Sequence, residues 1–157
     1  MARPDRKKYS PGEEYLSLMA PARALGEVRD CAVYSLAAAC GVPYETALAA
    51  LTAAGRTPRS GTSNRTIHNA LRALGFRWDC ISPGIFAERY FTEGKAAKAR
   101  HVTTHHPDRF SYCWPPGAWL MFTRGHVLAV VDGKNCDWSR GRSLRATRLY
   151  RITRIEE

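Results

Sequence analysis

The sequence contains no glutamine, no run of about 18 apolar residues and no two cysteines in a CxxC spacing. The missing apolar run excludes a helix that spans a membrane. No glycine-rich phosphate loop and no paired-carboxylate site stand out, so neither a cofactor nor a metal is expected. The five cysteines are odd in number, and the basic start of the chain does not resemble an export signal. We therefore expect reduced thiols in a cytoplasm rather than a disulfide framework.

The chain is strongly basic, because it has 24 Lys and Arg residues but only 14 Asp and Glu residues, for a net charge of +10. A surface of that charge attracts acidic proteins or nucleic acid. Apolar residues make up 45% and charged residues 24% of the 157 positions, which is the composition of a globular protein and not of a disordered one. This length is typical of one domain.

The chain divides into a short extension and one domain. Residues 1–24 are polar and carry Pro4, Pro11 and Pro21, so we expect them to wrap the surface or to be mobile. Residues 25–157 form the predicted single domain. Within it, apolar residues at helical spacing predict three successive helices, which end at Gly41, Gly55 and Gly75. The apolar positions of these helices are Val33–Cys40, Tyr44–Leu51 and Ile67–Leu74, the second following Pro43 and the third capped by Thr62 or Ser63.

The second half of the chain predicts mainly strands. The expected strands are residues 76–81, 118–122, 126–131, 135–138 and 144–155, with a short helix near residues 86–90. Turns are expected at residues 123–125 and at Asp132-Gly133. Helices followed by an antiparallel sheet indicate an α+β domain.

Three residues on these elements could form a catalytic site. Cys31 stands in the first turn of the first predicted helix, where unpaired N–H groups and the helix dipole stabilise a thiolate and an oxyanion. His126 opens the apolar strand 126–131 and is a candidate base. Asp137 lies on the strand expected to pair with it, where its carboxylate can orient the imidazole. Cys40 is at the helix end and is expected in the core.

These segments resemble a known family. The string Arg29-Asp30-Cys31-Ala32-Val33, the segment GHVLAVVDG at 125–133 and Cys136-Asp137-Trp138 resemble papain-like cysteine peptidases, especially the small phage- and prophage-associated relatives of the bacteriocin-leader (double-glycine) peptidases. The resemblance implies a papain-like α+β fold, Cys31 as nucleophile, His126 as general base and then acid, and Asp137 as the acid that orients it. It also implies a hydrolase that cleaves a protein or peptide substrate, encoded by a phage and located in the bacterial host cytoplasm or the virion.

The absence of glutamine departs from this family, whose members usually place a Gln before the nucleophile as an oxyanion donor. Backbone N–H groups near Cys31, or the side chain of Arg29, must then donate the hydrogen bonds that stabilise the oxyanion. Two other classes stay open: a cell-wall amidohydrolase of the NlpC or CHAP type, and a catalytically inactive phage protein of structural or nucleic-acid-binding role.

Other polar features have simpler interpretations. His101, His105, His106 and Cys113 cluster, but without the paired spacing of a zinc site. Asp132 precedes a glycine and is expected to bond its own turn rather than His126. The arginines at 142, 145, 148, 151 and 154 indicate an edge strand protected by charge, or a contact with nucleic acid or an acidic protein. Tyr112, Trp114, Trp119 and Trp138 are expected in the core and in cleft walls.

Overall fold

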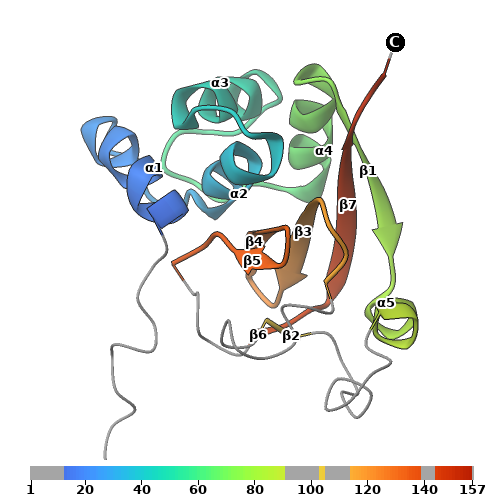
Figure 1. Cartoon of the computed structure of the whole chain (residues 1–157). Coiled ribbons are helices and arrows are strands. Elements are labelled where there is room, and N and C mark those ends of the chain that lie inside the picture. Colours follow the sequence, from blue (N-terminus) through green and yellow to red (C-terminus); the bar gives the residue numbers. More distant parts are fainter. Residues whose placement is uncertain (1–12, 91–102, 105–113, 139–143, 157) are drawn as a thin grey trace, which may run out of the picture.

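Figure 1 shows a computed structural model of the chain, which describes residues 13–90, 103–104, 114–138 and 144–156. These residues form an α+β fold, as the sequence predicts. The helices are α1 (Glu13–Ala24), α2 (Cys31–Cys40), α3 (Tyr44–Ala53), α4 (Asn64–Ala73) and α5 (Pro83–Tyr90). The strands are β1 (Phe76–Ile81), β2 (Thr103–Thr104), β3 (Ala118–Thr123), β4 (His126–Val131), β5 (Lys134–Asn135), β6 (Leu144–Arg145) and β7 (Arg148–Arg154).

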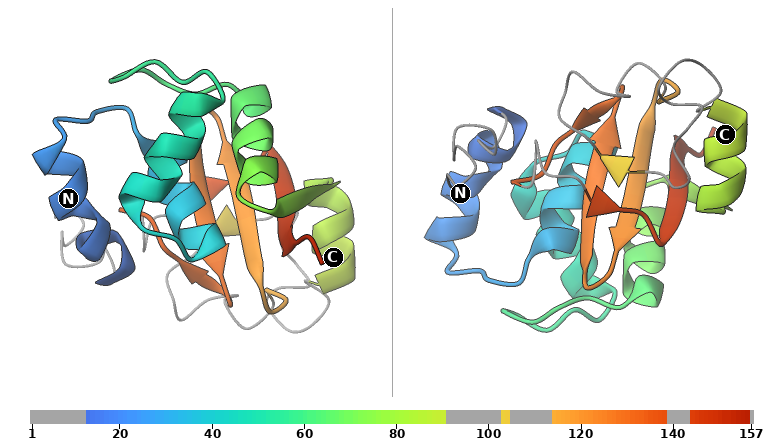
Figure 2. Two further views of the ribbon diagram at one scale, coloured as in Figure 1. Left: turned by 90° about the horizontal axis from the view of Figure 1, so that it is seen from above. Right: turned by 90° about the horizontal axis from the view of Figure 1, so that it is seen from below.

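The main sheet is antiparallel and open, with the strand order β1-β7-β3-β4-β5. β2 and β6 form a separate antiparallel pair. α2, α3 and α4 cover one face of the main sheet, and α5 lies beyond the end of β1 (Figure 1 and Figure 2). α2 packs against β4. The helix that begins at Cys31 therefore lies against the strand that begins at His126.

Local signals set the ends of the three central helices, and their prediction is confirmed. Gly41 ends α2 in the left-handed conformation, with φ 64°, which a glycine adopts without strain. Pro43 precedes α3 with an extended backbone. At the start of α4, the Ser63 hydroxyl accepts a hydrogen bond from the N–H of Thr66, so Ser63 is the N-cap.

The strands agree with the sequence in part. β1 and β4 have the predicted bounds, and β3 extends one residue further, to Thr123. α5 begins at Pro83, three residues before the predicted helix. β5 is limited to Lys134 and Asn135, although the N–H of Cys136 still donates to the carbonyl of Ala129 on β4.

The segment before residue 25 differs from the prediction. Its described part, from Glu13, forms α1 and does not simply wrap the surface. Ala22 of α1 is buried, and the ring of Tyr15 stacks on Tyr34 of α2 with centroids 4.4 Å apart. α1 contains Pro21, which is unfavourable in a helix. Packing against α2 compensates for this proline, and local sequence patterns do not reveal such packing.

The tail also differs, because β7 is not an edge strand. It lies between β1 and β3, so the interpretation as a charged edge is wrong. The arginines of β7 instead stand between apolar residues of the strand, and two of them cover aromatic rings. The guanidinium carbon of Arg151 lies 5.8 Å from the centre of the Trp119 ring, and that of Arg154 lies 5.1 Å from the centre of the Phe76 ring. Arg142 lies outside the described residues.

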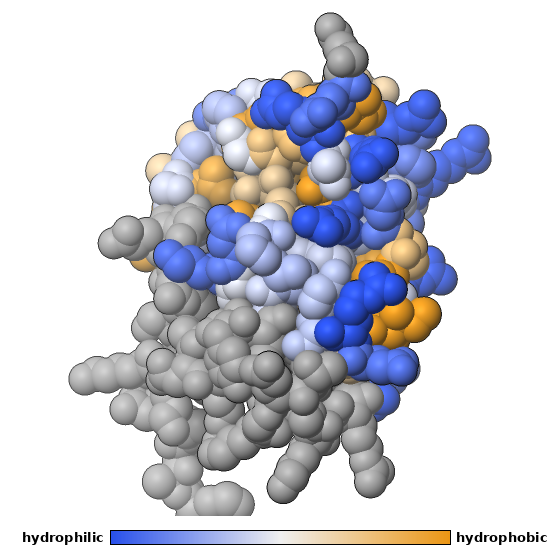
Figure 3. Space-filling model, turned by 45° about the vertical axis from the view of Figure 1, so that its right-hand side comes forward, coloured by the Kyte–Doolittle hydropathy of each residue, from blue (hydrophilic) through white to orange (hydrophobic). Residues whose placement is uncertain are grey.

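β1 is the outer strand on this side, and its exposed charges Arg77 and Asp79 lie 3.6 Å apart. Hydrophilic side chains cover much of the surface where β1 and β7 lie (Figure 3). Charge on an outer strand discourages pairing with another chain. The protective role that the sequence suggested for the tail therefore fits β1 better.

Apolar side chains pack on both faces of the sheet. On the helix side, the buried residues include Val33, Leu36, Leu51, Ile67, Leu71, Leu120, Val127 and Ile152. On the opposite face, the buried residues are Phe86, Ala87, Trp114, Trp119, Met121, Leu128, Val130, Ala146 and Leu149. Because both faces are covered, β4 is apolar at successive positions instead of alternating. Trp114 and Trp119 are core residues, as expected, and Tyr112 lies outside the described residues.

No single helix among the described residues is long and apolar enough to cross a membrane, and only α2 and α3, taken together and bent by 116°, reach that length and composition.

Asp132 occupies the turn after β4 with φ 49°, a left-handed conformation that aspartate tolerates. Its carboxylate accepts a hydrogen bond from the N–H of Gly117 at 2.8 Å, and its own N–H donates to the Gly117 carbonyl at 2.9 Å. The sequence predicts that Asp132 bonds its own turn. The structure shows instead that it joins the end of β4 to the start of β3.

This contact predicts a purely structural effect of substitution. Asp132→Ala removes the acceptor for Gly117 and lowers the free energy of unfolding by about 1 kcal/mol, measured by urea denaturation. Asp132→Asn is the matched control, since it keeps an acceptor and tolerates the left-handed backbone. The reactivity of Cys31 stays unchanged in both variants. An Asp132→Ala protein of full stability that loses this reactivity would contradict the assignment.

Candidate active site

Cys31 begins α2 and is half-buried. Asp30 is the N-cap residue, but its side chain makes no capping hydrogen bond, because its carboxylate accepts the hydroxyl of Tyr44 at 2.7 Å. The Asp30 carbonyl accepts the N–H groups of Val33 and Tyr34. Among the described residues, nothing accepts the N–H of Cys31 or of Ala32. Two backbone donors at the positive end of the helix dipole are therefore left beside the thiol.

Contacts with Val127 of β4 fix the position of this helix turn. The Ser35 hydroxyl, one turn after Cys31, lies 2.6 Å from the Cys31 carbonyl and 3.1 Å from the Val127 carbonyl. The backbone of Val127 also forms a hydrogen bond with the Cys31 side chain. The backbone of one β4 residue thus binds side chains from the first two turns of α2, which places the sulfur beside the start of β4.

His126 is the first residue of β4, and its Nε2 lies 2.8 Å from Oδ2 of Asp137. The His126 ring also forms a hydrogen bond with the Cys31 side chain. Because Nε2 is engaged by the carboxylate, Nδ1 is the ring nitrogen left for the sulfur. The structure therefore brings Cys31, His126 and Asp137 together in one hydrogen-bonded line.

Asp137 is held rigidly and away from solvent. It is 2% exposed, and its N–H donates to the side-chain carbonyl of Asn135 at 2.8 Å. The next residue, Trp138, places its ring 5.7 Å from the His126 ring and is itself 41% exposed. Trp138 is thus a cleft wall, as expected, and lines the same cavity as His126 and Asp137.

The electrostatics favour a thiolate and an imidazolium. Burial raises the pKa of Cys31, but the hydrogen bonds from His126 and the Val127 backbone, together with the charge on His126, hold it below its ordinary value. Burial lowers the pKa of His126, whereas its hydrogen bonds and charge interactions with Asp137 and Cys31 raise it to about 9. Both shifts favour the charged thiolate–imidazolium form of the pair.

The other cysteines have different surroundings. Cys40 is buried in the helix-side core, as expected, and burial raises the pKa of its thiol to about 12. Cys80 is exposed on β1, and Cys136, which directly follows β5, is buried. Cys113 lies outside the described residues, as do His101, His105 and His106, which cluster with it in the sequence. Within the described residues, no group of three or more His, Cys, Asp or Glu side chains could hold a metal ion.

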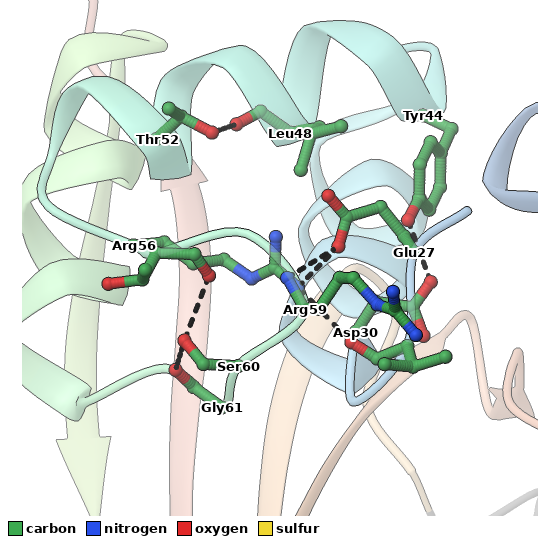
Figure 4. A network of polar contacts seen from close by, with 11 residues as sticks. Glu27, Asp30, Tyr44, Leu48, Thr52, Arg56, Arg59, Ser60 and Gly61 are labelled. Atoms are coloured by element: carbon green, nitrogen blue, oxygen red, sulfur yellow. Dashed lines mark hydrogen bonds and ion pairs between the residues drawn. The ribbon is translucent and has the colours of Figure 1, made fainter. Parts of the chain in front are cut away.

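A buried ion pair holds the loop before Cys31 to the loop after α3 (Figure 4). Arg56 donates to Glu27 at 3.0 Å, and the side chains are 0% and 8% exposed. The N–H of Arg59 donates to the same carboxylate at 3.1 Å. These hydrogen bonds hold the pKa of Glu27 below its usual value despite burial. The segment that follows Arg59 leads to Gly61, which lines the same cavities as Cys31, so the buried pair lies beside the part of the chain that borders the site.

Sequence reasoning missed several supporting residues. Ser35 follows Cys31 by four positions, a spacing that places both on one helix face and could have indicated the contact. Nothing in the sequence indicated the bond from Tyr44 to Asp30 or the ion pair of Glu27 with Arg56, because these contacts join loops and helices that are distant along the chain.

Comparison of the chain with protein-family models, with curated proteins and with solved structures finds no match. The assignment of the site therefore depends on its geometry alone.

The lowered pKa of Cys31 predicts selective labelling. Near neutral pH, iodoacetamide alkylates Cys31 faster than Cys80, although Cys80 is more exposed, because only the thiolate reacts. Peptide mapping by mass spectrometry after short reaction times measures the order. Labelling of Cys80 or Cys113 before Cys31 would contradict the assignment of the nucleophile.

The raised pKa of His126 predicts a pH profile that depends on Asp137. His126 is protonated below about pH 9 and loses its proton above it, so the alkylation rate of Cys31 is level across the thiolate–imidazolium range and changes again near pH 9. Asp137→Asn keeps a hydrogen-bond acceptor but loses the charge, so this upper change moves to lower pH. Asp137→Ala also frees the ring and slows alkylation near neutral pH by about tenfold or more.

Asp132→Ala is the control for the Asp137 variants, since it removes a carboxylate that lies beyond the opposite end of β4 from His126 and bonds Gly117. An unchanged pH profile in Asp137→Asn, together with a shifted profile in Asp132→Ala, would show that Asp132 is the orienting acid.

Proposed function

We propose that the protein is a papain-like cysteine hydrolase that cleaves an amide bond in a protein or peptide. The observation that carries this proposal is the line from the Cys31 thiol, through the His126 ring, to the buried carboxylate of Asp137. A nucleophile beside a base, with the base oriented by a third group, is the arrangement used in covalent acyl transfer.

In the first step, the Cys31 thiolate attacks the carbonyl carbon of the substrate, and the carbonyl π electrons move to oxygen. The resulting oxyanion is stabilised by the N–H groups of Cys31 and Ala32, which are free of capping because Asp30 bonds Tyr44. Re-formation of the carbonyl then breaks the C–N bond while the His126 imidazolium gives its proton to the leaving nitrogen. An amine departs and a thioester remains.

In the second step, neutral His126 takes a proton from water as that water attacks the thioester. The C–S bond breaks, a carboxylic acid is released, and the thiolate–imidazolium pair is restored. Asp137 bonds Nε2 throughout, so the ring keeps Nδ1 toward the sulfur in both steps.

The missing glutamine does not leave the oxyanion without donors, since two backbone N–H groups fill this role in the proposal. Arg29 is a weaker candidate, because it is exposed and its backbone has a left-handed φ of 53°. The cost of having no side-chain donor is about 10²–10³ in rate, so a slow enzyme is expected.

The papain-like assignment is supported by the helix that begins at the nucleophile and by its packing on the antiparallel strand that begins at the base. A phage origin and a location in the bacterial host cytoplasm or the virion stay predictions of the family resemblance.

A chromogenic ester tests the function without knowledge of the natural substrate. With p-nitrophenyl acetate, we expect a burst of p-nitrophenolate equal to the protein concentration, followed by slower turnover. Mass spectrometry should find the acetyl group on Cys31. Cys31→Ser abolishes both phases. His126→Ala slows acetylation, because the thiol loses the partner that lowers its pKa, and it leaves any acetyl group that does form trapped, since water is no longer activated.

Two outcomes would contradict the proposal. Acetylation of Cys31 without turnover in the unaltered protein would indicate a reactive but non-catalytic thiol, in line with the inactive, nucleic-acid-binding alternative. Release of peptide fragments from purified cell walls, without cleavage of soluble peptides, would indicate the cell-wall amidohydrolase.

A further inference from the structure

Two cavities lie on either side of the thiol, and they share the lining residues Cys31, Gly61, Gly125 and His126. The first has a volume of about 400 Å³ and the second of about 490 Å³. Because they meet at the thiol and the imidazole, they form two halves of one groove. A peptide lying in this groove passes over the sulfur, with residues on both sides of the attacked carbonyl.

The first half of the groove combines apolar walls with one uncommitted cation. Ile67, Phe122 and Val127 contribute apolar surface, while Arg148 and His126 are the charged or titratable side chains in this half apart from Cys31. No acidic side chain lines it. Within the described residues, no acid lies within ion-pair distance of Arg148.

Arg148 differs in this respect from its neighbours on β7. Arg151 covers the Trp119 ring and Arg154 covers the Phe76 ring, so each of them packs on an aromatic side chain of this protein. Arg148 packs on neither of these aromatic rings and lines the groove. Arg148 is exposed to solvent, so a ligand in the groove can reach its guanidinium. The groove also holds one buried polar atom, the Thr62 hydroxyl oxygen, which has no hydrogen-bond partner among the described residues.

The acidic groups of the second half are already engaged. Asp30 bonds Tyr44 and Asp137 bonds His126, whereas Arg29 in this half is exposed and has no ion-pair partner in the described part of the chain. Asp30 keeps its negative charge when it accepts the Tyr44 hydroxyl, so it offsets the charge of Arg29 in the same half. The uncommitted positive charge of the groove is that of Arg148 in the first half.

The sheet register gives the distance from the base to Arg148. His126 pairs with Thr123 on β3, and the adjacent Phe122 pairs with Arg148 on β7. With neighbouring strands about 4.8 Å apart, Arg148 begins about 10 Å from His126 across the sheet. An extended peptide advances about 3.3 Å per residue, so the second or third residue from the cleaved bond reaches Arg148.

We propose that Arg148 is a specificity residue that binds the carboxylate of an Asp or Glu side chain, two or three residues to one side of the cleaved amide. This rests on the proposed hydrolase function and adds the class of substrate. The planar guanidinium presents parallel N–H donors that match a carboxylate, and the apolar walls hold the intervening side chain.

The first test is cleavage of a mixed library of peptides with acetylated N-termini and amidated C-termini, which leaves side chains as the source of carboxylates. Mass spectrometry of the products should show Asp and Glu enriched at the second or third residue from the cut, on one side. Arg148→Gln removes this enrichment. Arg151→Gln is the matched control, since it is the same change on the same strand at a residue that packs on Trp119.

The second test measures binding and does not depend on catalysis. Fluorescence anisotropy follows the binding of blocked peptide mixtures with Glu or Gln at the fixed position to the Cys31→Ala protein. Because an exposed ion pair is weak, we expect about fivefold tighter binding of the Glu mixture at low salt, and less at high salt. Arg148→Gln in the same background makes the two mixtures equal.

The outcomes separate the two proposals. Cleavage without acid enrichment, or equal binding of the Glu and Gln mixtures to the Cys31→Ala protein, overturns the role of Arg148 and leaves the hydrolase proposal standing. Preference for the Glu mixture that survives Arg148→Gln also overturns it. Absence of cleavage and of ester turnover, with the binding preference present and lost in Arg148→Gln, overturns the hydrolase and keeps Arg148 as a carboxylate site.

Discussion

The position of α2 on β4 depends on the backbone groups of Val127 that pair with no neighbouring strand. β5 pairs only with the last two residues of β4, so the outward backbone groups of Val127 have no strand partner. Ser35 and Cys31 of α2 bind these groups instead. A longer β5 would take them, and the helix would lose the contact that sets the depth of the thiol. The short strand is therefore a condition for the site.

A second constraint acts from the loops. The carboxylate of Asp30 would ordinarily cap the helix, but it bonds Tyr44 and leaves the first N–H groups of α2 available. The buried pair of Arg56 and Glu27 holds the same loop against the segment that leads to Gly61. The start of α2 thus lacks the stabilising hydrogen bond of a side-chain cap, while the ion pair stabilises the loops beside it. Such a distribution is common at functional sites.

Much of the site followed from local patterns. A cysteine at a helix start, a histidine at the mouth of an apolar strand and a turn at Asp132 suffice to place Asp137, and not Asp132, near His126. The partners of these residues on other elements did not follow: Asp132 bonds Gly117 because β4 pairs with β3, and Ser35 bonds Val127 because α2 packs on β4. The same limit applies to the fold: α2, α3, α4, β1 and β4 follow from periodicity and turn residues, while α1 depends on the stacking of Tyr15 with Tyr34.

The place of β7 could not be read from its composition, and it has a consequence for how the protein is made. β7 follows every other strand in the sequence, yet it joins β1 on one side to β3 on the other. Until residue 154 has left the ribosome, β1 and β3 each lack a neighbour, and the backbone N–H and C=O groups with which they pair to β7 have no strand partner. Pairing between segments so distant along the chain is slow. The nascent protein therefore completes its sheet after synthesis of this region, and is most prone to aggregation in that interval.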